Sequence, residues 1–128
     1  MRELAYYEAK FEALEEIMAA DQRVHLINGT FLSLSPHRHV YQNLKTKYAE
    51  RMISPPISEL GFCGLATGAA MAGLRPIVDL STGSFIYEAW PQVANEAANA
   101  YSRTGCSVVG VALPIGQRPC TRHGGRRR

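Results

Sequence analysis

A single carboxyl group at the start of a helix rich in small residues is the first candidate for chemistry in this sequence. Glu59 follows Ser58, which can cap a helix, and a Pro-Pro-Ile stretch that excludes helix precedes both. The small residues of this helix are Gly61, Gly64, Ala66, Gly68, Ala69, Ala70, Ala72 and Gly73. Each interior glycine costs about 1 kcal/mol of helix stability relative to alanine. We therefore expect this helix to be buried where another backbone or a ligand approaches closely, with Glu59 at its amino-terminal end.

Plainer interpretations of the same stretch stay open. Ser58-Glu59 is also an ordinary helix start, because the helix dipole favours a carboxylate in the first turn by roughly 0.3–1 kcal/mol. The glycines match neither a phosphate-binding loop nor the Gly-x-Gly-x-x-Gly fingerprint of dinucleotide-binding proteins. The stretch does not predict a membrane span, because Arg75 and Pro76 interrupt the weakly apolar run. Pro76 is the predicted end of the helix.

The cysteines and histidines form no metal or redox motif. Cys63, Cys106 and Cys120 are odd in number and widely spaced, so neither a disulfide framework nor a metal site is predicted. This usage indicates a reducing, intracellular setting, and acidic residues near the amino terminus exclude a secretory signal. We expect a cytoplasmic protein that does not associate with membranes. His37 and His39 are interpreted either as substrate or phosphate contacts or as solvated loop histidines.

Length and charge distribution predict one domain with a basic tail. The chain has 128 residues, of which 46% are hydrophobic, enough for a core of its own. The net charge of +3 arises at the carboxyl-terminal end, which closes with Gly-Gly-Arg-Arg-Arg. We expect a domain over residues 1–115 and a disordered basic tail over residues 116–128. The alternative to a disordered tail without a partner is a tail that binds nucleic acid or an anionic surface, although nucleic acid is not the favoured partner.

The sequence predicts alternating helices and strands, which position Glu59 and the other candidate residues. The predicted helices cover residues 6–20, 41–50, the stretch between Ser58 and Pro76, and residues 83–103, with Pro91 bending or splitting the last. The predicted strands cover residues 24–27, 51–54, 77–80 and 107–113, and residues 32–40 are a predicted loop. This alternation predicts a three-layer α/β fold whose mainly parallel sheet has helices on both faces. Ligands bind at the carboxyl ends of such strands, so the loops after Ile27, Ser54 and Leu80 are the places to look for function.

Three segments resemble the beta subunit of 2-oxo acid dehydrogenase E1 components, a family that includes pyruvate, branched-chain 2-oxo acid and acetoin dehydrogenases. The segments are residues 13–24, 55–78 and 85–98, and the similarity covers roughly residues 3 to 105. The most specific part is Pro-Pro-Ile-Ser-Glu-Leu-Gly-Phe-Cys-Gly-Leu-Ala-Thr-Gly-Ala-Ala-Met-Ala-Gly-Leu-Arg-Pro. The resemblance implies a transketolase-like, pyrimidine-binding domain of a thiamine diphosphate enzyme. It also implies oxidative decarboxylation of a 2-oxo acid, with acyl transfer to lipoamide.

The resemblance implies roles for three residues. Glu59 is the implied catalytic residue, because the acid of this motif hydrogen-bonds N1′ of the aminopyrimidine of thiamine diphosphate and shares a proton with it. Phe85 matches the aromatic residue that packs on the aminopyrimidine face, and Ile57 lies beside the same ring. For Phe85, an ordinary core position on the long helix remains the alternative.

The chain departs from the family's pattern at several positions. The family usually has Gly-Glu-Asp or Gly-Glu-Glu after the first strand, whereas this chain has Ile-Asn-Gly, so an expected acid has become Asn28. A glutamine that lies near the cofactor in the family is Glu88 here. Beyond Gly105 the resemblance fades, and His123 does not match the family's active-site histidine. The family's carboxyl-terminal domain is absent.

A partner subunit is implied by the lack of a Gly-Asp-Gly motif, through which the family's alpha subunit holds pyrophosphate and magnesium. This chain would hold only the pyrimidine half of thiamine diphosphate, and the partner would hold Mg²⁺. The implied partners are an E1 alpha-type subunit, in a homo- or hetero-oligomer such as a heterotetramer, and a lipoyl E2 component. The alternative is a catalytically inactive relative that acts as a subunit-interaction module. We expect no activity from the chain alone.

Overall fold

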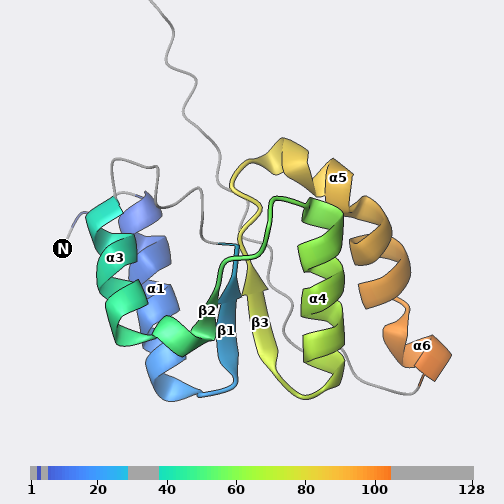
Figure 1. The fold of residues 1–128 in the computed structure, drawn as a ribbon, viewed down its shortest axis with the longest axis horizontal. Helices are drawn as coiled ribbons and strands as arrows, with labels where there is room; N and C mark the ends of the chain where they lie inside the picture. The colour runs from blue at the N-terminus through green and yellow to red at the C-terminus, as the bar shows by residue number, and fades with distance from the viewer. Residues whose placement is uncertain (1–2, 4–5, 29–37, 105–128) are drawn as a thin grey trace, which may run out of the picture.

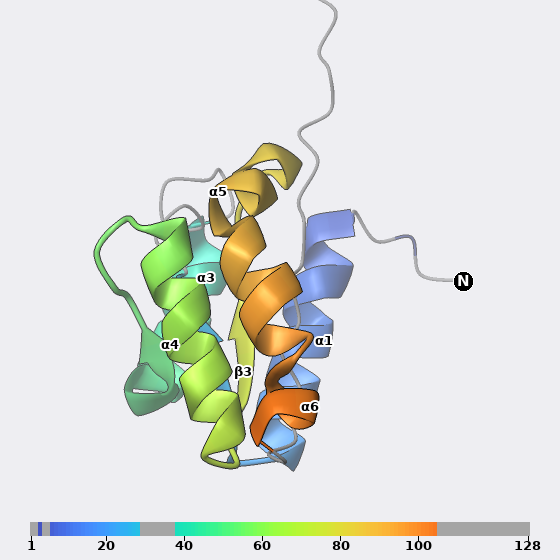
Figure 2. The same ribbon diagram turned by 90° about the vertical axis from the view of Figure 1, so that its right-hand side faces the viewer.

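The fold is a parallel three-stranded sheet between two layers of helices (Figures 1 and 2). A computed structural model of the chain describes residues 3, 6–28 and 38–104. The strands are β1 (Val24–Ile27), β2 (Met52–Ile53) and β3 (Arg75–Val78). They lie in the order β2-β1-β3, and both pairings are parallel. The predicted α/β fold class is thereby confirmed.

The strand register places the ends of the three strands level with one another. Ile27, the last residue of β1, pairs with Ile53 of β2 and with Val78 of β3, which are the last residues of those strands. The loops that leave the strands therefore start from one edge of the sheet, which we call the carboxyl edge. It lies at the top of the sheet in Figure 1.

Two helices, α1 (Tyr6–Ala20) and α3 (Arg38–Lys47), form one of the helical layers. Apolar residues of α1 recur at spacings of three and four, which places them on one face of the helix. The cluster between this layer and the sheet consists of Phe11, Leu14, Met18, Val24, Leu26, Tyr41, Leu44 and Met52. The predicted bounds of α1 and β1 are confirmed.

The second helix of this layer differs from its prediction of residues 41–50. It begins at Arg38, within the predicted loop, because Val40 packs partly buried on the cluster and extends the apolar stripe toward the amino terminus. It ends at Lys47, since Tyr48 leaves the helical region with φ −130°. A 3-10 turn, η1 (Ala49–Arg51), then leads into β2, so the strand predicted for residues 51–54 is shorter than expected.

The other helical layer begins with α4 (Glu59–Met71), the helix of small residues. Its inner face packs on the sheet in a second cluster at the carboxyl edge. That cluster consists of Ile27, Phe62, Cys63, Ala66, Val78, Leu80 and Ala89. The expectation that α4 is buried holds for this face.

The end of α4 corrects the prediction that Pro76 stops this helix. Gly73 has φ +96°, its amide donates to the Ala70 carbonyl oxygen, and the Leu74 amide donates to the Ala69 carbonyl oxygen, at 3.0 Å each. This is the paired bonding of a Schellman motif, which places glycine just after the helix. Pro76 instead lies in β3, which starts at Arg75 rather than at residue 77 and ends before residue 80.

A proline is tolerated in β3 because of where its missing amide would point. The Arg75 amide donates to the carbonyl oxygen of Arg23, directly before β1, at 2.8 Å, and the Asp79 amide donates to that of Ile27, in β1, at 3.0 Å. Alternate residues of a strand face opposite neighbours. The nitrogen of Pro76 therefore faces away from β1, and no hydrogen bond to that strand is lost.

The segment predicted as one helix over residues 83–103 is broken into four pieces beside α4 (Figure 2). They are η2 (Gly83–Phe85), α5 (Ile86–Trp90), the π-helical η3 (Pro91–Ala97) and α6 (Ala100–Thr104). The split at Pro91 confirms the sequence prediction. Proline lacks an amide and its ring crowds the preceding turn, so the helix widens there. The Ala98 amide accordingly donates to the Val93 carbonyl oxygen, five residues back, at 3.1 Å.

Several predictions concern residues outside the described part of the chain. These are the strand at residues 107–113, the domain boundary at 115, the tail at 116–128, His37 and His123. His39 is described, and it lies exposed on α3. Among the described residues, no helix has the length and apolar character needed to cross a membrane.

Candidate functional site

Glu59 lies at the carboxyl edge as the first residue of α4 (Figure 1). Ser58 caps this helix, since its Oγ accepts a hydrogen bond from the Gly61 amide at 3.2 Å. The Glu59 side chain is half-buried, and within the described part of the chain no hydrogen bond or ion pair engages its carboxyl group. Burial and, after it, the Glu59 charge raise the pKa of the buried Cys63 thiol to about 11. Cys63 is therefore protonated near neutral pH and is no nucleophile.

The other two predicted site residues belong to segments at the same edge. Ile57 lies on the loop from β2 to α4 and is 68% exposed, and its neighbour Leu60 is 47% exposed. Phe85 ends η2 and packs half-buried against the second cluster. The structure thus brings the segments that carry Ile57, Glu59 and Phe85 together at one edge. Phe85 also contributes to the core, as the alternative interpretation expected.

Asp79, which the sequence analysis did not single out, is the most buried polar residue of this edge. It follows β3 directly and has 0% exposure. Its Oδ1 lies 3.7 Å from the Nζ of Lys10 on α1 and accepts a hydrogen bond from the Ser81 amide at 3.0 Å. Its Oδ2 has no hydrogen-bond partner among the described residues. Burial raises the pKa of the Asp79 carboxyl, although Lys10 and the Ser81 amide act in the opposite direction.

Asn28, directly after β1, is hydrogen-bonded to the backbone of Asp79. It is 2% exposed, and its Nδ2 donates to the backbone carbonyl oxygen of Asp79 at 2.8 Å. Asn28 has φ +64°, a conformation that costs most residues roughly 1–2 kcal/mol and glycine almost nothing. Asn28 thus combines a buried bond to Asp79 with a backbone conformation that glycine would adopt at less cost.

One sequence signal could have indicated Asp79. It is the first polar residue after an apolar strand of a predicted parallel sheet, at the end where such sheets bind ligands. The sequence analysis placed it inside a strand over residues 77–80. Its partner Lys10 carried no comparable signal, because the contact joins elements far apart in the chain.

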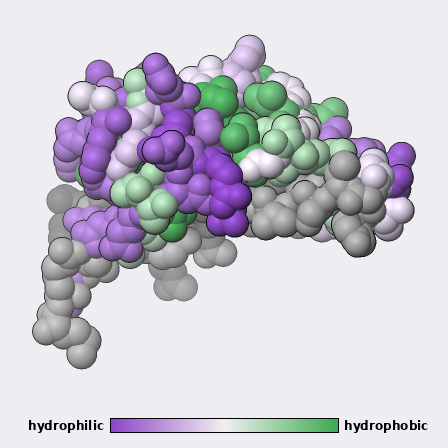
Figure 3. Space-filling model, turned by 90° about the horizontal axis from the view of Figure 1, so that it is seen from below, coloured by the Kyte–Doolittle hydropathy of each residue, from purple (hydrophilic) through white to green (hydrophobic). Residues whose placement is uncertain are grey.

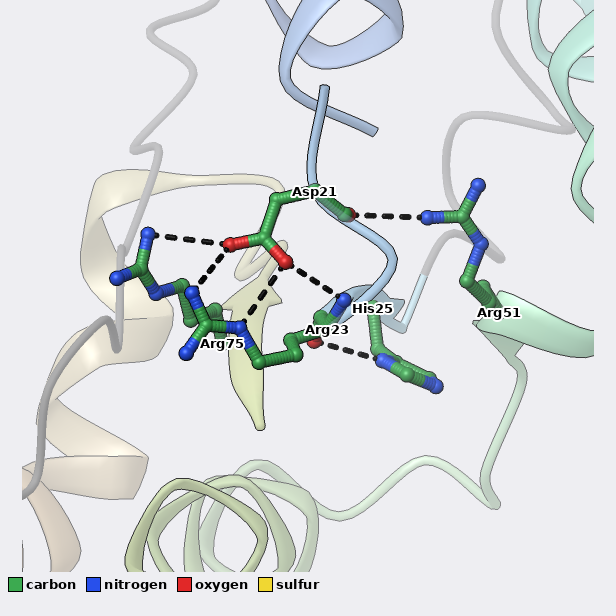
Figure 4. Close-up of polar contacts among 5 residues, drawn as sticks. All are labelled: Asp21, Arg23, His25, Arg51 and Arg75. Atoms are coloured by element: carbon green, nitrogen blue, oxygen red, sulfur yellow. Dashed lines mark hydrogen bonds and ion pairs between the residues drawn. The ribbon is translucent and has the colours of Figure 1, made fainter. Parts of the chain in front are cut away.

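A second polar cluster lies at the opposite edge of the sheet and serves the fold (Figure 4). The carboxylate of Asp21 contacts Arg23 at 2.9 Å and Arg75 at 3.1 Å. Hydrogen bonds from Arg23, and then the charges of Arg23 and Arg75, lower the pKa of Asp21 to about 2, with burial opposing. Arg51 donates to the backbone carbonyl oxygens of Met18 and Asp21 at the end of α1. The cluster therefore ties the end of α1 and the start of β1 to η1 and β3, and both oxygens of the Asp21 carboxylate have partners.

The outward side of α4 is apolar and uncovered by the described residues. A Cβ at Gly64 would lie 3.2 Å from Oε1 of Gln92, which shows how closely η3 approaches there. A Cβ at Gly68 would meet no described atom beyond its own helix backbone within 4 Å. Leu65 is 49% exposed and Met71 38% exposed. Viewed from the end opposite the carboxyl edge, the surface is hydrophilic over α1 and α3 and more apolar over α4 (Figure 3).

The comparisons with known proteins agree with this arrangement. The family described as "Transketolase, pyrimidine binding domain" matches residues 2–126. The chain is 40% identical over 99 residues to the mitochondrial pyruvate dehydrogenase E1 component subunit beta of Bos taurus, covering 77% of this chain and 28% of that protein. The human protein of the same name is 40% identical over 95 residues, covering 73% of this chain and 26% of that protein. The pyruvate dehydrogenase E1 component subunit beta of Rickettsia conorii (strain ATCC VR-613 / Malish 7) is 38% identical over 102 residues, covering 79% of this chain and 31% of that protein. The chain thus spans less than a third of the length of these relatives.

Proposed function

Because the chain belongs to the family of transketolase pyrimidine-binding domains, we propose that it supplies the pyrimidine half of a thiamine diphosphate site in a 2-oxo acid dehydrogenase E1 component. The observation that carries the proposal is the position of Glu59. Its carboxyl group lies half-buried at the carboxyl edge, unengaged within the described part of the chain. Ligands of parallel α/β sheets bind at this edge. Thiamine diphosphate would supply there the electron sink for decarboxylation of a 2-oxo acid.

The residues at the edge fit a flat, partly apolar ring that carries a basic nitrogen. Glu59 would hold a proton shared with N1′ of the aminopyrimidine. Ile57 offers an exposed apolar side chain two residues before it, and Phe85 offers a ring that is only half-buried. An apolar surface around one carboxyl group excludes water and orients the ring, so that the shared proton lies at a defined atom.

A partner subunit would complete the site. Within the described ranges, no group of three or more His, Cys, Asp or Glu side chains is placed to hold a metal ion. We assign the pyrophosphate and Mg²⁺ to an E1 alpha-type subunit, and transfer of the acyl group to a lipoyl E2 component. The exposed Leu65 and Met71 and the open space over Gly68 support docking of the alpha-type subunit on α4. The names of the relatives, which are subunits of a component, agree with this assignment.

Calorimetric titration of thiamine diphosphate and Mg²⁺ tests the proposal. The titrant is added to the chain, to an E1 alpha-type subunit and to their mixture, and decarboxylation of pyruvate and of branched-chain 2-oxo acids is assayed in the mixture. We expect high-affinity binding that requires both proteins and a loss of activity of at least about 100-fold in Glu59→Gln. Glu16→Gln, an exposed acid on α1, is the matched control and keeps its activity. Association without cofactor binding would replace the enzyme proposal by the interaction-module alternative.

A further inference from the structure

Asp79 lies buried at the end of β3, where three residues from other parts of the fold contact it. Lys10 reaches it from α1, Asn28 holds its backbone from the end of β1, and the Ser81 amide binds its Oδ1 from the following turn. The side chain is fully buried, whereas Lys10 remains 19% exposed. Burying a carboxylate carries a desolvation penalty that a charge pair only partly offsets. Stabilising the sheet alone would not require such a costly arrangement. The arrangement also affects the geometry of the turn that follows Asp79.

The turn that Asp79 holds leads into η2, whose last residue is Phe85. Ser81 has φ +64°, and the bond from its amide to Asp79 Oδ1 stabilises this left-handed conformation, as in an Asx turn. The Thr82 amide then donates to the Leu80 carbonyl oxygen at 2.7 Å, and the Phe85 amide donates to the Thr82 carbonyl oxygen at 3.1 Å. A continuous set of short bonds thus runs from the buried carboxyl to the backbone of Phe85.

We propose that Asp79, held by Lys10, is the positioning residue that sets Phe85 at the carboxyl edge for contact with the cofactor ring. The inference rests on the proposed function, since Phe85 is the aromatic side chain assigned to the aminopyrimidine face. Asp79 touches no reacting atom and acts through the turn at Ser81. A turn with a left-handed residue, held by a hydrogen bond to a buried and ion-paired side chain, is typical of sites where local geometry is fixed in advance.

NMR signals of the phenylalanine rings test, in the 128-residue chain without any cofactor, whether Asp79 positions Phe85. The chain contains four phenylalanines, so ¹³C-labelled rings give few signals, and Phe85→Leu assigns the relevant one. We expect Asp79→Ala to shift the Phe85 signal strongly. Asp79→Asn retains an acceptor for the Ser81 amide and should shift it less, and Lys10→Met should shift it in the same direction. Phe62 belongs to the cluster against which Phe85 packs, so its signal should shift too, but less than that of Phe85, in all three variants.

Asp21→Asn is the matched control, because Asp21 is also an ion-paired carboxylate but lies at the opposite edge of the sheet. This variant should leave the Phe85 signal in place. An unshifted Phe85 in folded Asp79→Ala and Lys10→Met would overturn the inference. An equal shift of the Phe62 and Phe85 rings would also overturn it, since that result indicates general loosening.

Titration of thiamine diphosphate into the mixture of the chain and the alpha-type subunit tests whether the position of Phe85 affects cofactor binding. We expect Asp79→Ala to weaken thiamine diphosphate binding about 10-fold, Asp79→Asn to weaken it less, and Asp21→Asn to leave it within about twofold. Unchanged affinity in Asp79→Ala, with Phe85 displaced, would overturn the link to the cofactor. If the unmodified mixture binds no cofactor, the proposed function and the cofactor link both fail, while the ring signals still decide whether Asp79 positions Phe85.

Discussion

Nδ2 of Asn28 lies 2.8 Å from the backbone carbonyl oxygen of Asp79, and this buried bond ties the end of β1 to the end of β3. The Asp79 amide in turn donates to the carbonyl oxygen of Ile27 at 3.0 Å. The two strands are thus linked beyond their last paired residues, at the edge where the site is proposed.

Replacing Asn28 separates its hydrogen bond from its backbone conformation. Asn28→Ala removes the bond and retains a side chain at φ +64°, so we expect a loss of about 2–3 kcal/mol in the free energy of unfolding. Asn28→Gly removes the same bond and relieves the conformational cost, so its loss should be about 1 kcal/mol smaller than that of alanine. Urea unfolding measures both. Equal losses would show that the left-handed backbone carries no cost here.

Removing the cap of α4 should weaken the helix that begins at Glu59. Ser58→Ala leaves the Gly61 amide without the Ser58 hydroxyl, and we expect a loss of about 1 kcal/mol in the free energy of unfolding. Ser58→Asp supplies another acceptor and should retain most of the stability. Ser54→Ala, on the exposed loop before the helix, is the control. The capping assignment fails if the two alanine variants are equally stable.

Two glycines of the same segment should respond to alanine with opposite signs. Among the described residues, a Cβ at Gly68 or Gly73 would meet no atom of another segment within 4 Å, so the backbone conformation decides the effect of alanine. Gly68→Ala, inside α4, should stabilise the chain by roughly 0.5–1 kcal/mol. Gly73→Ala, at φ +96°, should destabilise it by about 1–2 kcal/mol. Thermal unfolding distinguishes the two, and a destabilised Gly68→Ala would contradict the open surface over α4.

Acid should weaken the polar cluster at the amino ends of the strands. The pKa of Asp21 is lowered from 3.8 to about 2 in the folded chain, so folding favours its ionised form. Its contribution to stability is present above about pH 4 and is lost as the pH falls toward 2. The difference between wild type and Asp21→Asn, followed by urea unfolding from pH 5 to pH 2, should shrink over this range. A constant difference would show that the ion pairs with Arg23 and Arg75 contribute nothing.

Local signals in the sequence determined much of the fold and part of the candidate site. The apolar stripe of α1 and the apolar run of β1 predicted Tyr6–Ala20 and Val24–Ile27, because hydrophobic periodicity is a property of neighbouring residues. The cap at Ser58 was readable for the same reason, since the hydroxyl bonds an amide three residues away. The end of α4 was misplaced at Pro76, although Gly73 supplied the local signal that decided it.

Only the tertiary structure revealed the buried contacts of Asp79. Lys10, Asn28 and Asp79 come from segments far apart in the chain, and no short-range pattern states that they meet. The burial of a polar residue depends on what packs over it, which the sheet order β2-β1-β3 and the placement of α1 decide. The sequence thus located the acid at the mouth of α4. The fold decided that Asp79 would be enclosed at the end of β3, because burial and ion pairing are set by contacts between distant segments.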